Sequence, residues 1–208
     1  RSSKRLQLQA PLRYLIVAHS MFRGQLDEFI AWKRRQGFIT DIAYTDDPEV
    51  GTSNSDIAAY IRRQYTNASA ALPAPSYLLL VGDHEQISAF SSRTGHYEIG
   101  TNHITDLYFA EWTDDFIPDC LYGRLSATNA DELQAQISKI LLYEQYAFAD
   151  DSYLQRATII AGVDDEFSSR YGNPAMDYAA ARYYTTANGF SNLSYYRYNN
   201  NSFPPSIT

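Results

Sequence analysis

The feature that most constrains the fold of this chain is an alternation of short apolar runs with segments of helical periodicity. Residues 14–18, 77–81 and 157–161 are short, almost wholly apolar runs, as in strands that are buried on both faces. Apolar residues recur at helical spacing over 22–33 and 133–144. This strand–helix–strand order predicts an α/β fold, in three α/β/α layers, with a mostly parallel sheet.

Weaker patterns complete the order of elements. Strands are predicted at 38–44, 104–109, 120–125 and 193–198, and a loop at 85–102. The helix after residue 56 has its N-cap candidates among residues 52–56. Asn173 and Pro174 predict the N-cap and first position of a further helix, which ends at Asn188 and Gly189.

A polar break at residues 150–152 is the best candidate for a domain boundary. It predicts a first α/β subdomain over 13–149 and the start of a second over 150–208. The second has a single crossover, and two strands with one helix cannot bury both faces of a sheet. We therefore expect that subdomain to be incomplete within these residues.

Composition excludes several classes of protein. The 208 residues carry 17 Lys and Arg against 24 Asp and Glu, a net charge of −7, which argues against nucleic acid as the main partner. No apolar run approaches the roughly 20 residues that a transmembrane helix needs. The single cysteine, Cys120, excludes an intrachain disulfide framework and a multi-cysteine metal site.

In open parallel sheets, functional side chains gather at the carboxyl ends of strands. Polar residues follow three predicted strands here, at 19–20, 82–85 and 162–166. The first strand is not followed by the G-x-G-x-x-G spacing of a dinucleotide-binding loop. A nucleotide-binding domain is therefore a weak alternative.

Acidic residues offer two kinds of site. Asp83, Asp114, Asp115 and Asp119 supply the carboxylate oxygens that calcium prefers, although a solvated acidic loop would have the same composition. Asp164 follows a buried strand and a glycine, so its side chain can project into a cleft at the sheet edge. The alternative for Asp164 is a carboxylate that accepts hydrogen bonds from the backbone of its own loop.

Candidates for a nucleophile and base are Cys120 and one of the four histidines, His19, His84, His96 and His103. Cys120, however, begins an apolar strand, where a small buried thiol is the commoner outcome. A serine triad has no G-x-S-x-G motif here.

Several segments together resemble the gingipain family of cysteine endopeptidases, most closely its lysine-specific members. The segments are AWKRRQG (31–37), LLVGDHEQI (79–87), TDLYF (105–109), DCLYGRL (119–125), KILLYE (139–144) and IAGVD (160–164). The resemblance runs in one order from about Arg13 to Tyr198, which makes it far more specific than any single motif.

The resemblance implies a caspase-like catalytic region of two side-by-side subdomains. The family's histidine, in a His-Gly motif, and its cysteine nucleophile are expected downstream of Thr208, and Cys120 does not match that nucleophile. Asp164 matches the acidic residue that orients the histidine. The expected activity is hydrolysis of protein or peptide substrates by thiolate acyl transfer, with this chain inactive by itself until the remaining catalytic segment or a companion chain is present.

The same resemblance implies structural calcium, with Asp83 and Asp119 as ligands. Asp115, from the acidic set described above, is a further candidate ligand. It also implies a secreted or bacterial cell-surface protein. The alternative is a non-catalytic binding or scaffold module of the same fold.

Overall fold

The computed structural model describes residues 11–92 and 103–199. The chain divides into two compact units, Arg1–Tyr146 and Ala147–Thr208, and each is described by itself. The division falls a few residues before the polar break at 150–152. That the second unit is an incomplete subdomain stays a prediction.

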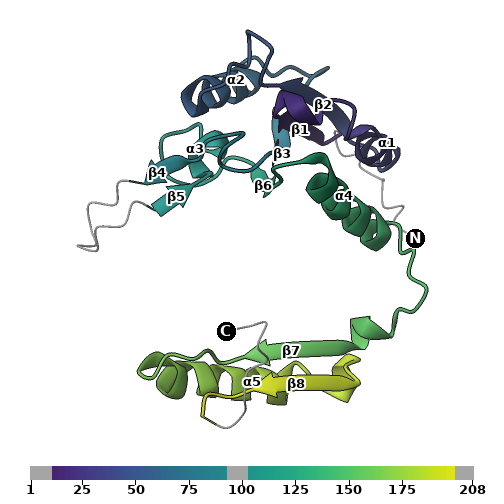
Figure 1. The fold of residues 1–208 in the computed structure, drawn as a ribbon, viewed down its shortest axis with the longest axis vertical. Coiled ribbons are helices and arrows are strands. Elements are labelled where there is room, and N and C mark those ends of the chain that lie inside the picture. Colours follow the sequence, from purple (N-terminus) through teal and green to yellow (C-terminus); the bar gives the residue numbers. More distant parts are fainter. Residues whose placement is uncertain (1–10, 93–102, 200–208) are drawn as a thin grey trace, which may run out of the picture. The chain divides into compact units, whose positions relative to one another are not determined.

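The first unit is built on a four-stranded parallel sheet (Figure 1). Its strands lie in the order β2 (Ile39–Tyr44), β1 (Arg13–Ala18), β3 (Pro75–Val81) and β6 (Leu121–Leu125). Because all the neighbours run parallel, their carboxyl ends share one edge of the sheet. The predicted strands at 14–18, 38–44, 77–81 and 120–125 are confirmed.

Helices cover both faces of this sheet, because its strands are apolar on both sides. Helices α1 (Asp27–Arg35) and α4 (Ala130–Glu144) pack on one face, around Ile16, Leu79 and Val81. Helices α2 (Asn54–Thr66) and α3 (Leu107–Ala110) pack on the other face, around Leu15 and Leu80. The first unit is thus a three-layer α/β/α sandwich, as predicted.

Local capping explains where two of these helices begin. Ser53 Oγ accepts a hydrogen bond from the backbone N–H of Asp56 at the start of α2. Asn129 Oδ1 accepts one from the N–H of Glu132 at the start of α4. Each bond satisfies a backbone donor that has no partner within its helix.

One prediction for the first unit is wrong in part. Residues 104–109 do not form one strand, because β5 (His103–Thr105) ends before α3 begins. Strand β5 pairs in antiparallel fashion with β4 (Phe90–Ser92), a short strand inside the predicted loop 85–102. Residues 93–102 of that loop lie outside the described residues.

The second unit contains one parallel pair of strands, β7 (Arg156–Ile160) and β8 (Asn192–Tyr196), which confirms both predicted strands. Helix α5 (Asn173–Arg182) connects them and follows directly on a π-helical turn (Ser168–Gly172). Single 3-10 turns occur at Ser152–Gln155 and Thr186–Asn188, and another in the first unit at Ser20–Phe22.

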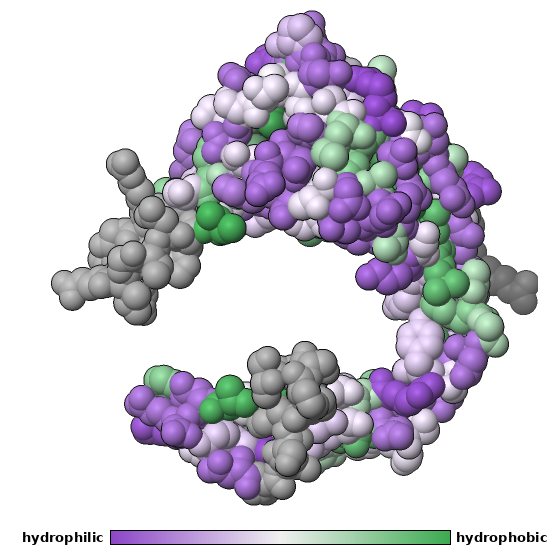
Figure 2. Space-filling view, in the orientation of Figure 1, coloured by the Kyte–Doolittle hydropathy of each residue, from purple (hydrophilic) through white to green (hydrophobic). Residues whose placement is uncertain are grey.

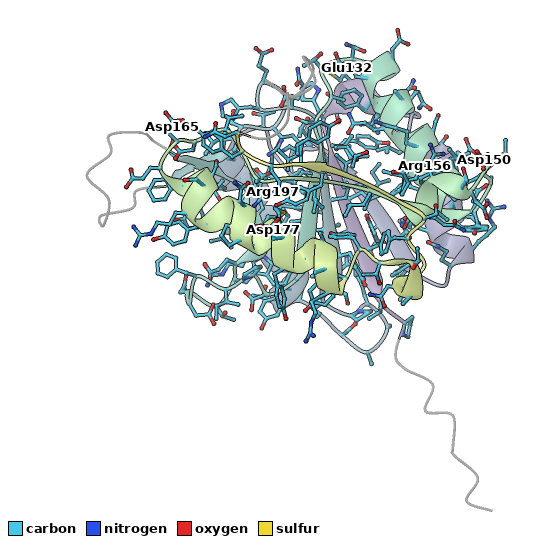
Figure 3. The ribbon with its side chains drawn as sticks, turned by 90° about the horizontal axis from the view of Figure 1, so that it is seen from below. Glu132, Asp150, Arg156, Asp165, Asp177 and Arg197 are labelled. Carbon is cyan, nitrogen blue, oxygen red and sulfur yellow. The ribbon has the colours of Figure 1, made fainter. Side chains whose placement is uncertain are left out.

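Ion pairing ties α5 to the end of β8. Arg197 Nη2 lies 2.7 Å from Asp177 Oδ2, and the two side chains are next to each other in Figure 3. Tyr195 Oη donates to the other oxygen of Asp177 at 2.9 Å. These bonds also lower the pKa of the Asp177 carboxyl, with the Arg197 bond as the larger cause.

The surface of each unit is mainly hydrophilic on the face seen in Figure 2, with apolar groups in scattered patches. None of the helices in the described parts of the chain combines the length and the apolar character that a bilayer crossing requires.

Candidate functional site

Asp164 lies in the loop that follows β7, at the carboxyl end of that strand, and its side chain is exposed. Its Oδ1 accepts hydrogen bonds from the backbone N–H of Glu166 (2.9 Å) and Phe167 (2.7 Å). Its backbone carbonyl accepts the N–H of Ser168 at 3.0 Å. The carboxylate therefore accepts hydrogen bonds from the backbone of its own loop, as the alternative for Asp164 predicted, but through one oxygen only.

The second carboxylate oxygen of Asp164, Oδ2, accepts no hydrogen bond from any residue that the structure describes. Two backbone donors thus fix the orientation of the carboxylate, while one oxygen stays accessible to an incoming donor. A carboxylate held in this way can accept an imidazole N–H and fix its tautomer.

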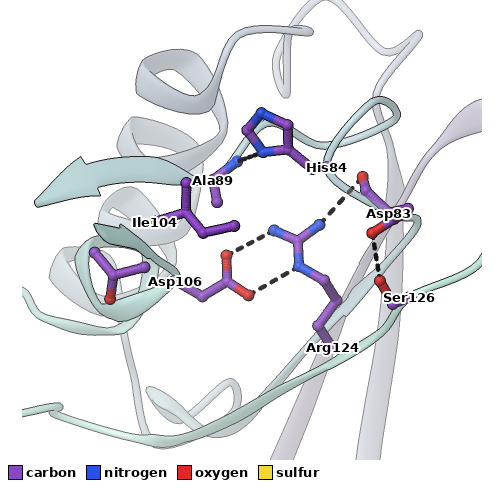
Figure 4. Close-up of a pocket in the computed structure, with 8 residues that line it drawn as sticks. Asp83, His84, Ala89, Ile104, Asp106, Arg124 and Ser126 are labelled. Atoms are coloured by element: carbon purple, nitrogen blue, oxygen red, sulfur yellow. Dashed lines mark hydrogen bonds and ion pairs between the residues drawn. The ribbon is translucent and has the colours of Figure 1, made fainter. Parts of the chain in front are cut away.

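A second group of polar side chains lies at the carboxyl edge of β3 and β6 (Figure 4). Arg124, near the end of β6, makes a two-point ion pair with Asp106, at 2.8 Å and 2.7 Å. Its Nη1 donates to the carbonyls of Gly82 (2.8 Å) and Ile87 (2.9 Å). Arg124 therefore holds the loop after β3 against the segment before α3.

A cavity of about 220 Å³ lies beside the Arg124 ion pair, and His84, Ile104 and Ser126 also line it. Asp83 borders this cavity. Its Oδ1 accepts the hydroxyl of Ser126. This bond, followed by one from the backbone of His84, lowers the pKa of the Asp83 carboxyl, so the side chain is ionised at neutral pH.

Asp119 holds the loop between α3 and β6. Its Oδ2 accepts the backbone N–H groups of Trp112 (2.5 Å) and Thr113 (3.1 Å), and its Oδ1 accepts the hydroxyl of Thr113. Asp115 accepts the N–H of Ile117 at 2.8 Å within the same loop. Both carboxylates are therefore occupied by local backbone donors.

The structure does not bring Asp83 and Asp119 together. In the parallel register of β3 and β6, Val81 pairs with Leu125 and Tyr77 pairs with Leu121. Asp83 follows the carboxyl end of β3, whereas Asp119 precedes the amino end of β6. The four residue steps of β6, at about 3.3 Å each, separate the two edges.

A calcium ion shared by Asp83 and Asp119, as the resemblance implies, does not fit this register. No group of three or more His, Cys, Asp or Glu side chains in residues 11–92 and 103–199 is arranged to hold a metal ion. Asp115 lies in the Asp119 loop and does not supply a third ligand near Asp83.

Cys120 is buried, at 8% exposure, in the core cluster beneath α2 and α3. Burial, and secondly the charge of Asp119, raises the pKa of its thiol to about 12. Its packing partners in the described cluster include no histidine. The expectation of a buried thiol is therefore confirmed. A nucleophilic cysteine would instead need a lowered pKa and access to substrate.

Two of the four histidines are also engaged locally. His19 Nδ1 accepts the N–H of Met21, and His84 Nδ1 accepts the N–H of Ala89. The side chains of His96 and His103 lie outside the described residues.

Sequence reasoning assigned no role to Arg124. The signal that could have found it is a lone charged residue near the carboxyl end of an otherwise apolar predicted strand.

Comparison with known proteins identifies the chemistry of the relatives. The sequence model of Peptidase family C25 matches residues 7–204. Lys-gingipain W83 of Porphyromonas gingivalis is 37% identical over 186 residues, which cover 89% of this chain and 10% of that protein.

Two solved structures support the fold. One, described as a protease, is 36% identical with a TM-score of 0.82, and the match covers 90% of this chain and 40% of the other. The Arg-specific cysteine proteinase gingipain R matches with a TM-score of 0.72 over 97% of this chain and 44% of its own. At 19% identity this second likeness shows the caspase-like fold alone.

The chain therefore spans about a tenth of the curated relative and less than half of each solved chain. The match to the family model, over residues 7–204, nevertheless covers nearly all of this chain. These 208 residues belong to peptidase family C25, whose gingipain members are cysteine peptidases.

Proposed function

We propose that these residues are the amino-terminal portion of the catalytic region of a secreted, gingipain-like cysteine endopeptidase. The observation that carries the proposal is the geometry of Asp164. Two backbone N–H groups orient its carboxylate through Oδ1, and Oδ2 stays accessible at the carboxyl end of β7. Membership of family C25 supplies the reaction class.

In the proposed reaction, a cysteine and a histidine outside these residues carry out the chemistry on a protein or peptide substrate. The thiolate attacks the peptide carbonyl, a thioester forms, the amine leaves with a proton from the imidazole, and water then releases the acid. Asp164 Oδ2 accepts the second imidazole N–H, which orients the ring and stabilises the imidazolium beside the thiolate.

The first unit contributes the scaffold in this proposal. Its three-layer core gives a rigid support, and the remaining catalytic segment, in the same polypeptide or a companion chain, supplies the nucleophile and the substrate pocket. Placement at the bacterial surface or outside the cell is part of the proposal, supported by the 37% identity to a gingipain.

Calcium enters the proposal only for the intact protein. Asp83 is ionised and borders a cavity, which supports a role as one ligand. Asp119 is not a second ligand there, because it lies at the opposite edge of the sheet, and Asp106, which lines the same cavity, is paired with Arg124.

The test compares the isolated 208 residues with the intact protein on peptide substrates. The isolated chain should show no thiol-dependent hydrolysis. In the intact protein, Asp164→Asn should lower kcat by about 10²-fold or more, since the imidazole loses its orienting acceptor. Activity of the isolated chain, or a fully active Asp164→Asn protein, would contradict the proposal.

The alternative, a non-catalytic module of the same fold, predicts a different pair of results. Neither the isolated chain nor the intact protein would hydrolyse peptides, and Asp164→Asn would change nothing.

A further inference from the structure

Gly172 lies at the junction between the π-helical turn and α5, and it approaches a neighbouring backbone unusually closely. A Cβ built at this position would lie 2.2 Å from the carbonyl oxygen of Ala161. The φ of Gly172 is −64°, an ordinary helical value. Glycine is therefore needed here for close approach rather than for conformational freedom.

The carbonyl group that Gly172 approaches belongs to the strand end that leads to Asp164. Ala161 follows β7 directly, and its N–H extends the ladder by bonding the carbonyl of Tyr196 at 3.0 Å. Gly162 then turns the chain with a φ of +97°. Contact with Gly172 thus fixes the backbone three residues before Asp164.

Asn173, the next residue along, holds the end of the neighbouring strand. Its side chain is buried at 9% exposure, and its Oδ1 accepts the N–H of Tyr198 at 2.9 Å. Its Nδ2 donates to the carbonyl of Tyr198 at 3.3 Å. The start of α5 is therefore seated against the carboxyl ends of both β7 and β8.

The far end of the Asp164 loop is held by the same helical segment. Ser168 is buried at 4% exposure, and its N–H bonds the carbonyl of Asp164. A Cβ added at Gly162 would lie 2.8 Å from Ser168 Oγ, so this contact is also close. Both ends of the loop are thus fixed by contacts with the segment Ser168–Asn173.

We infer that Gly172 and Asn173 are positioning residues for catalysis: their contacts with Ala161 and Tyr198 set where the Asp164 carboxylate lies. This inference rests on the proposed function. A methyl group at position 172 would force the helix away from the end of β7 and move Asp164 with it. Displacements of about 1 Å in such positioning cost on the order of 10²-fold in rate.

The test uses the intact protein with Gly172→Ala and counts active sites with a tight-binding covalent inhibitor. Expressed per titrated site, kcat should fall about 10-fold or more with KM within twofold of wild type. The alkaline limb of the pH profile of kcat/KM should also move to lower pH. A more distant carboxylate stabilises the imidazolium less, which lowers the imidazole pKa.

Gly123→Ala is the matched control, because a Cβ at Gly123 meets nothing within 4 Å and its φ is not positive. That variant should keep the wild-type kcat and pH profile. A Gly172→Ala protein that merely loses stability would have fewer active sites but an unchanged profile, and this result would overturn the inference.

Asn173→Ala provides a second variant if Gly172→Ala does not fold. It removes both bonds to Tyr198, and the alkaline limb should move in the same direction. An unchanged profile would contradict the inference. Asp164→Asn separates the two proposals. If the Asp164→Asn protein is fully active, the proposed function fails. If that variant is impaired while Gly172→Ala and Asn173→Ala behave as wild type, only the positioning role fails.

Discussion

Cys120 shows how one residue can be misleading in a cysteine peptidase family. It is the single cysteine of the chain, yet it is buried in the core, and its environment raises the thiol pKa to about 12. A nucleophile requires the opposite, a thiolate at neutral pH with access to substrate. The thiol is a packing group.

The first prediction follows from this burial. At pH 8 the folded chain should react with iodoacetamide far more slowly than the same chain unfolded in urea, because both access and thiolate are lacking. Mass spectrometry measures the alkylated fraction with time. Alkylation of the folded chain at the rate of a cysteine in a short peptide would contradict this account.

The raised thiol pKa also predicts the pH dependence of stability. The ordinary thiol pKa of 9.0 applies to the unfolded chain, and the folded value is about 12. The unfolded state therefore loses its proton first, so the Cys120 contribution is complete below pH 9.0 and is lost as the pH rises toward 12. In urea unfolding, the free energy of unfolding should be lower at pH 10.5 than at pH 8. This fall should be smaller in Cys120→Ala than in the wild-type chain.

A substitution at Asp119 tests whether this side chain binds calcium. Asp119→Ala removes the acceptor for two backbone N–H groups and one hydroxyl in the loop before β6. We expect the free energy of unfolding to fall by about 1–3 kcal/mol, with the same loss in calcium and in chelator. A loss seen only in calcium would instead make Asp119 a metal ligand.

At the scale of elements, a partly buried ion pair joins α1 to α4. Lys33 Nζ lies 2.6 Å from Glu144 Oε1, and its side chain is 9% exposed. Trp32 Nε1 donates to the other Glu144 oxygen at 2.7 Å. The Lys33 ammonium also lies 5.4 Å from the ring centre of Tyr14. The last turn of α4 is thus fixed to the end of α1.

Removal of Glu144 should therefore be costly. Glu144→Ala leaves the Lys33 ammonium buried without a counter-charge, and we expect a loss of roughly 3 kcal/mol in the free energy of unfolding. The exposed pair of Arg23 and Asp46 is the matched control, since Asp46→Ala should cost about 0.5 kcal/mol or less. Equal losses in the two variants would contradict the assigned role.

Most elements of this fold could be predicted from the sequence, because buried strands and amphipathic helices leave strong patterns. The failures have local causes. Leu107–Ala110 is a helical turn whose apolar residues resemble a strand, and four residues are too few to show a helical period. Asn173 was expected to cap a helix, but its side chain bonds Tyr198, because the π-helical turn before it already continues the helix.

The candidate site was less predictable than the fold. Asp164 could be found from its place after a strand and a glycine. The contact of Gly172 with Ala161 could not, because it depends on tertiary approach. The structure does not bring Asp83 and Asp119 together for a related reason. The parallel register of β3 and β6 places Asp83 after the carboxyl end of one strand and Asp119 before the amino end of the other.

At the scale of the whole molecule, the two units differ in how much they bury. The first unit has two clusters of buried apolar residues, one on each face of its sheet. In the described part of the second unit, the buried residues are Ile159, Ser168 and Asn173. A unit with so little buried apolar surface should open more readily than the first.

Hydrogen exchange measures this difference directly. In the isolated chain, the backbone amides of Leu80 and Ile16 should exchange slowly, near the rate of global unfolding. The amides of Ile159 and Leu193 should exchange much faster. Equal protection in both units would favour a complete, self-sufficient module over a portion of a larger catalytic region.

We propose that this chain contributes the scaffold and Asp164 to a cysteine peptidase whose nucleophile lies outside these residues. The most direct test treats the active intact protein with a peptide-based electrophile that labels catalytic thiolates, and then maps the modified cysteine by mass spectrometry. We predict a label outside residues 1–208 and an unmodified Cys120. A stoichiometric label on Cys120, with loss of activity, would contradict the account.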